Sequence, residues 1–84
     1  MPVLARLDGI IIRMYFQQEE HNPPHVHAIY GDYIIAVDIR TGEVLDGSFP
    51  PKRKAIVSQW VLEHQSDLLH IWETQDFTRF DPKA

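Results

Sequence analysis

Two alternating runs of residues, joined by a two-residue turn, constrain the fold of this chain most strongly. The runs are 25–30 and 33–39, and the pair Gly31-Asp32 between them is of the Gly-first kind typical of tight hairpins. If the hairpin closes there, Tyr30 faces Tyr33 and, counting back along both strands, His25 faces Asp38. The sequence therefore predicts an antiparallel hairpin and also its register.

This register sorts the hairpin side chains onto two faces, because successive side chains of a strand point to opposite sides. The first face carries Val26, Ala28, Tyr30, Tyr33, Ile35, Val37 and Ile39. The second face carries His25, His27, Ile29, Ile34, Ala36 and Asp38. A shift of one residue would exchange the two faces, so the prediction depends on the turn. With the turn at Gly31-Asp32, two histidines and one carboxylate share the face opposite the core.

The segment 20–28 leads into this hairpin and holds three of the five histidines, His21, His25 and His27. Each proline of the pair Pro23-Pro24 fixes its own φ and keeps the preceding residue out of the helical region. We therefore expect an extended approach to His25 with few alternative conformations. The concentration of imidazoles makes this segment the candidate functional site.

The rest of the chain predicts one further strand, a short strand stub and two helices. The predicted elements are a lead-in at 1–8, a strand at 10–16, a stub at Val44-Leu45, a helix at 52–64 and a second helix capped by Ser66. Residues 76–84 are polar and contain Pro82, which predicts a frayed tail. The expected fold is one α+β domain spanning 1–84. It consists of a three- to four-stranded antiparallel β-meander followed by a two-helix hairpin packed on one face.

Composition narrows the function classes. The chain has 84 residues and no cysteine, which excludes disulfides, thiolate metal ligands and a cysteine nucleophile. Its formal net charge of -4 argues against uniform electrostatic attraction to nucleic acid. No apolar run approaches membrane-spanning length and the N-terminus lacks a signal-peptide pattern, so we expect a cytoplasmic protein.

The chain resembles a family of short bacterial proteins catalogued as domain of unknown function 4160. The resemblance covers roughly residues 6–73, and its most specific part is the Pro-Pro-His-x-His element. The matching segments are 21–28, Tyr30-Gly31, 38–45, Gly47, Pro50, Trp60 and 68–72. The tail from Asp76 departs from the usual family ending. The resemblance implies a fold but no catalytic residue. It also implies a neighbouring gene for a second small protein, in an arrangement like a toxin–antitoxin pair.

One hypothesis for the histidine face is a divalent-metal site. His25 and His27 are two apart on a strand, about 7 Å between Cβ atoms, so both imidazoles can reach one ion. Asp38, His21 or Glu20 would supply the third ligand. Without thiolates, the nitrogen and oxygen ligands would suit zinc, nickel, manganese or iron.

A second hypothesis is metal-free acid–base chemistry at His25, His27 and Asp38. A pair of imidazoles can act as base and acid in one reaction, for example in cleavage of an RNA phosphodiester through its 2′-hydroxyl. Asp38 would orient His25, and Arg13 or Arg40 would bind the phosphate. RNA would then be the partner.

The third and favoured hypothesis is an interaction module. The histidine face also carries Ile29, Ile34, Ala36 and Leu45, a pattern typical of a contact surface for a partner chain or for the protein's own helices. In this hypothesis the histidines have no chemical role, and the imidazoles are hydrogen-bonded to the backbone or to Asp38. The expected partner is another small protein encoded nearby. The open strand edge after Val44 would also permit a homodimer.

Overall fold

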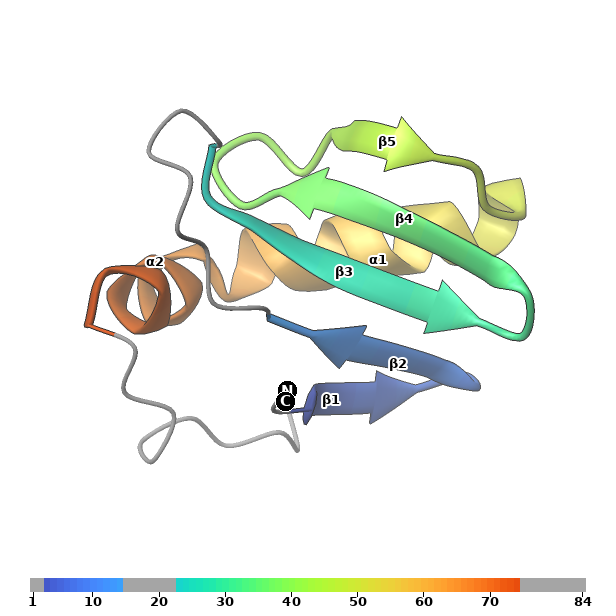
Figure 1. The fold of residues 1–84 in the computed structure, drawn as a ribbon, viewed down its shortest axis with the longest axis horizontal. Coiled ribbons are helices and arrows are strands. Elements are labelled where there is room, and N and C mark those ends of the chain that lie inside the picture. Colours follow the sequence, from blue (N-terminus) through green and yellow to red (C-terminus); the bar gives the residue numbers. More distant parts are fainter. Residues whose placement is uncertain (1–2, 15–22, 75–84) are drawn as a thin grey trace.

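The computed structural model describes residues 3–14 and 23–74, which form a five-stranded antiparallel sheet followed by two helices (Figure 1). The strands lie in the sheet in chain order, from β1 at one edge to β5 at the other. The elements are β1 (Val3–Leu7), β2 (Ile10–Arg13), β3 (His25–Tyr30), β4 (Tyr33–Asp38), β5 (Val44–Gly47), α1 (Pro51–Glu63) and α2 (Gln65–Thr74). The α+β class is confirmed, but the predicted three to four strands are too few.

The additional strand is β1, within the segment predicted to be a lead-in. It pairs with β2 through a two-residue turn, Asp8-Gly9, in which both residues have positive φ (52° and 77°). Such a turn matches the twist of a hairpin and favours Asp-Gly. An irregularity in the register between Val3 and Ala5 leaves both Leu4 and Ala5 buried. Two consecutive buried residues interrupt the alternation by which a strand is recognised.

The central hairpin has the predicted register. All six pairs of β3 and β4 match, from His25 opposite Asp38 to Tyr30 opposite Tyr33. Gly31 at the turn has a φ of 58°. The face predicted to be internal is buried at Val26, Ala28, Ile35, Val37 and Ile39. The period-2 pattern and the turn were therefore sufficient to determine this part of the fold.

Strand β2 extends the sheet on the other side of β3. It pairs Ile12 with Ala28 and Arg13 with His27, and its buried residues Ile10 and Ile12 continue the internal face. The strand ends at Arg13. The predicted continuation at 15–16 lies outside the described residues, as does the predicted tail at 76–84.

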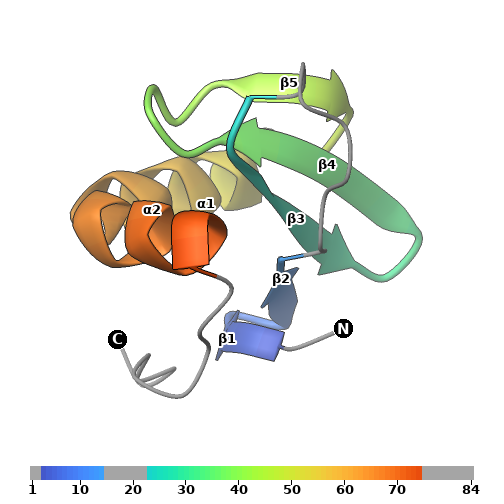
Figure 2. The same ribbon diagram turned by 60° about the vertical axis from the view of Figure 1, so that its left-hand side comes forward.

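Both helices pack on the internal face of the sheet (Figures 1 and 2). Helix α1 begins with Pro51, where the missing N–H would have no intrahelical partner. The chain leaves α1 at His64, and α2 begins at Gln65 rather than after a Ser66 cap. In Figure 1, α1 runs along the sheet whereas α2 is seen nearly end-on. The single-residue break at His64 is too short to reverse the chain, so the helices form a corner instead of the expected helical hairpin.

One core holds these layers together, and its members come from every element except β5. They include Leu4, Ile10, Ile12, Met14, Val26, Ile35, Val37, Val57, Trp60, Val61, Leu68 and Ile71. No helix in the described part of the chain is long and apolar enough to cross a membrane.

The turn between β4 and β5 is anchored to the helices by side-chain hydrogen bonds. Ser58 donates through Oγ to the carbonyl oxygen of Gly42 (2.7 Å). Gln65 donates through Nε2 to the carbonyl oxygens of Ile39 (3.1 Å) and Arg40 (2.8 Å). These contacts satisfy turn carbonyls that the sheet leaves unpaired and fix the path of the chain into β5.

Candidate functional site: a histidine depression on the outer sheet face

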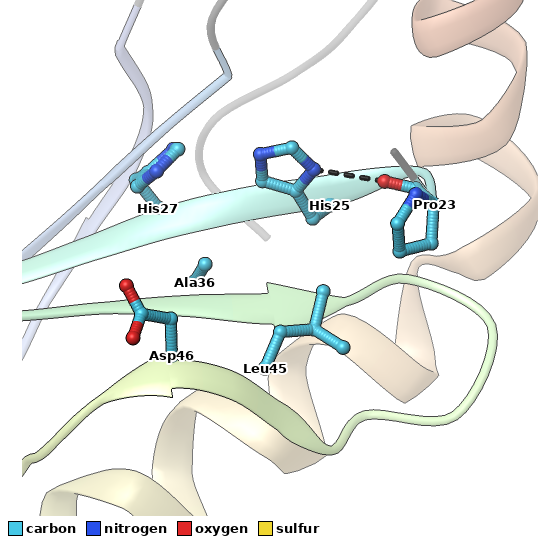
Figure 3. Close-up of a pocket in the computed structure, with 6 residues that line it drawn as sticks. All are labelled: Pro23, His25, His27, Ala36, Leu45 and Asp46. Atoms are coloured by element: carbon cyan, nitrogen blue, oxygen red, sulfur yellow. Dashed lines mark hydrogen bonds between the residues drawn. The ribbon is translucent and has the colours of Figure 1, made fainter. Parts of the chain in front are cut away.

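The helices cover one side of the sheet, and the side facing away from them is here called the outer face (Figure 2). The register places His25, His27 and Ala36 on the outer face, together with Ile29 and Ile34. The outer face contains a depression of about 300 Å³ that is open to solvent. It is lined by Pro23, His25, His27, Ala36, Leu45 and Asp46 (Figure 3).

The shape of this depression follows from one small side chain. Ala36 pairs with His27 on one side and with Asp46 on the other, so the three form a row across β3, β4 and β5. In Figure 3, Ala36 lies between the two histidines and the side chains of Leu45 and Asp46. A single methyl group at the centre of the row leaves space between its larger neighbours.

The imidazole of His25 is held in one orientation by the proline corner. Its Nδ1 lies 2.8 Å from the carbonyl oxygen of Pro23, and its ring is 5.2 Å from that of Trp72 on α2. A carbonyl oxygen only accepts hydrogen bonds, so the proton of this contact is on Nδ1. In the neutral ring, Nε2 therefore carries the lone pair. His25 is only 8% exposed.

His27 is adjacent to His25 and differs in its electrostatics. The two rings are 5.0 Å apart in an edge-to-face arrangement. Burial lowers the pKa of His27 below its usual value of 6.5, and the neighbouring His25 charge lowers that pKa further. At neutral pH His27 is therefore uncharged and retains one donor and one acceptor nitrogen.

Asp38 lies directly across from His25, as predicted, but its carboxylate is used elsewhere. Its Oδ1 accepts a hydrogen bond from the backbone N–H of Arg40 at 2.7 Å, and Asp38 is not among the residues that line the depression. This local contact is an Asx turn, common where a strand enters a loop. The carbonyl of Pro23, rather than Asp38, fixes His25 in this structure.

His21 and Glu20, two of the predicted metal ligands, lie outside the described residues. Within residues 3–14 and 23–74, no group of three or more His, Cys, Asp or Glu side chains could hold a metal ion. The described part of the chain thus contributes two adjacent imidazoles rather than a complete ligand set.

Asp46 is the lining residue that the sequence did not single out. It follows the predicted strand stub Val44-Leu45, whereas the structure includes it in β5 and pairs it with Ala36. The register of β4 and β5 shifts between Ala36 and Val37, so simple alternation from Val44 does not assign its face. The sequence does contain an indication of this arrangement. Ala36 is small and lies opposite His27, so it leaves space for a side chain from the next strand.

Comparison with known proteins identifies the family of this chain. A model described as domain of unknown function DUF4160 matches residues 9–73, which include the proline corner, the hairpin and both helices as far as Glu73. The chain belongs to the DUF4160 family. No curated protein and no solved structure matches it. The suspected family is thereby confirmed, and with it a domain whose function has to be inferred from the site.

The coupling of the two histidines gives a prediction for pH. The pKa of His27 should lie below 6.5, and His25→Ala should raise it, because both burial and the repulsive neighbour are reduced. NMR titration of the imidazole signals measures the His27 pKa in the unaltered protein and in the variant. Below pH 6.5 the unfolded chain binds more protons at His27 than the folded chain, so the contribution of His27 to stability decreases as the pH falls. His70→Ala, at an exposed position of α2, is the control and should leave the His27 pKa unchanged. A His27 pKa at or above 6.5 in the unaltered protein would contradict this assignment.

Proposed function

We propose that this DUF4160 domain is an interaction module and that its outer face, centred on the histidine depression, binds a partner protein. The observation that carries the proposal is the exposure of large apolar side chains beside the depression. Ile34 is 49% exposed and Leu45 is 46% exposed. Apolar side chains around an open depression are typical of contact surfaces. We infer that the partner is the small protein expected from the neighbouring gene.

The lining chemistry supports binding more than phosphodiester cleavage. A phosphate entering the depression would meet the Asp46 carboxylate, which repels it. His27 is uncharged at neutral pH and so contributes no cation to offset that repulsion. Arg13 lies beside His27 in the sheet but is not part of the lining.

The proposal predicts that a charge placed on the outer face abolishes partner binding. Ile34→Asp should weaken the affinity for the neighbouring gene's product at least about tenfold, because a buried interface would desolvate an unpaired carboxylate. Calorimetric titration of the two purified proteins measures the effect. Circular dichroism of the variant checks that the fold is retained.

The matched control is Leu62→Asp, a similar change at a leucine that is 45% exposed on α1 rather than on the outer face. It should leave the affinity unchanged. Equal weakening by both variants, or no binding between the unaltered proteins, would refute the proposal.

Expression of the protein alone should not slow bacterial growth. A growth defect that disappears with His25→Ala or His27→Ala would instead favour ribonuclease chemistry.

A further inference from the structure

We infer that the histidine depression accepts an arginine side chain from the bound partner. This inference rests on the proposed function, because it names the group that the outer face recognises. The evidence is the set of hydrogen-bonding groups in the lining, the size of the depression and the position of the nearby charges.

The lining offers more acceptors than donors. Asp46 contributes a carboxylate, which is acceptor-only when ionised. His25 contributes the lone pair of Nε2, since its Nδ1 proton is committed to the Pro23 carbonyl. The neutral ring of His27 contributes one donor and one acceptor nitrogen, and the side chains of the remaining lining residues, Pro23, Ala36 and Leu45, are apolar. A ligand that complements this lining is rich in donors, carries a positive charge and has an apolar stem.

The size and shape of the depression favour arginine over a bare cation. A volume of about 300 Å³ is some ten times that of one water molecule in the liquid, which exceeds what a single ion occupies. A guanidinium is planar, binds carboxylates through two parallel hydrogen bonds and stacks on flat rings. His27, the more exposed of the two imidazoles, presents such a ring, and the Leu45 side chain can contact the methylene stem.

The other charged groups around the depression are compatible with a cation there. Among the described residues that line the depression, Asp46 alone carries a formal charge while the imidazoles are neutral. Arg13 is the cation paired with His27, but it lies on β2, three strands from Asp46 in the sheet order. Three strand spacings place the backbone positions of Arg13 and Asp46 about 14 Å apart, which exceeds the screening length of about 8 Å at physiological salt. Asp38, opposite His25, adds a second negative charge to this end of the sheet.

A peptide titration tests the inference without the partner. The probe is a blocked Gly-Arg-Gly tripeptide, followed through the imidazole and backbone NMR signals of the unaltered protein. We expect the His25, His27 and Asp46 signals to shift together, with a dissociation constant in the millimolar range for one side-chain contact. The same peptide with citrulline, which keeps the shape but lacks the charge, should bind at least about tenfold more weakly. The lysine peptide should also bind more weakly than arginine, because an ammonium cannot pair in a bidentate manner.

The variant Asp46→Asn tests whether the Asp46 carboxylate recognises arginine, separately from whether the outer face binds the partner protein. It should weaken the arginine peptide at least about tenfold, whereas Asp32→Asn, in the exposed β3–β4 turn, should have no effect. Absence of shifts at His25 and His27, or equal binding of the citrulline peptide, would overturn the inference. If Asp46→Asn lost the peptide but bound the partner protein normally, arginine would not be what the partner presents. In that case the interaction module would stand and this inference would fail.

Discussion

Gly47→Ala should destabilise the protein by about 3 kcal/mol or more, a large part of the stability of a small domain. Gly47 ends β5 with a φ of 87°, a conformation that costs a side chain about 1–2 kcal/mol. A Cβ atom at this position would also overlap the backbone carbonyl oxygen of Ile34 and lie 3.2 Å from the Cα of Ile35. Backbone atoms of a central strand cannot rotate away as a side chain can. Strand β5 would have to separate from β4.

Gly31→Ala is the matched control for this prediction. Gly31 also has a positive φ, 58°, but no atom of residues 3–14 or 23–74 lies within 4 Å of a Cβ placed there. The free energy of unfolding of this variant should fall only by the cost of a side chain at positive φ, about 1–2 kcal/mol. Urea denaturation of both variants measures the difference. If the two substitutions cost the same, the close packing of β5 against β4 would be incorrect, and with it the position of Leu45 and Asp46 in the depression.

Ile35→Ala should cost about 2–5 kcal/mol, whereas Ile34→Ala, one residue earlier on the same strand, should cost less than about 1 kcal/mol. Ile35 is 1% exposed in the core and Ile34 is 49% exposed on the outer face. Truncating Ile35 leaves a cavity that the packed core cannot close. Truncating Ile34 removes a side chain that is half in water.

The pair also tests function, because the two variants should separate stability from binding. Ile34→Ala should weaken the affinity for the proposed partner while the urea midpoint remains near that of the unaltered protein. Ile35→Ala should lower the midpoint and, at temperatures where it remains folded, bind the partner normally. Similar losses of stability at both positions would mean that the faces of the hairpin are assigned incorrectly. Both measurements use the same purified variants.

The sequence by itself determined the parts of this protein that depend on neighbours along the chain. Alternation in β3 and β4, with the Gly31-Asp32 turn, specified six residue pairs and placed both histidines on the outer face. Period and turn type are local properties, and the buried face allows only one register. The Pro-Pro-His corner was recognisable for the same reason.

Features that depend on more distant contacts were decided only by the tertiary structure. Strand β1 was missed although Asp8-Gly9 is a recognisable hairpin turn, because Leu4 and Ala5 are both buried and break the alternation. Asp38 was the carboxylate chosen from the sequence, since it pairs with His25. The backbone of Arg40 binds its carboxylate, and Asp46 lines the depression instead. Which carboxylate lines the depression depends on how β5 is aligned with β4. That alignment is fixed by an irregularity in the strand register and by hydrogen bonds from Ser58 and Gln65, which no short-range pattern encodes.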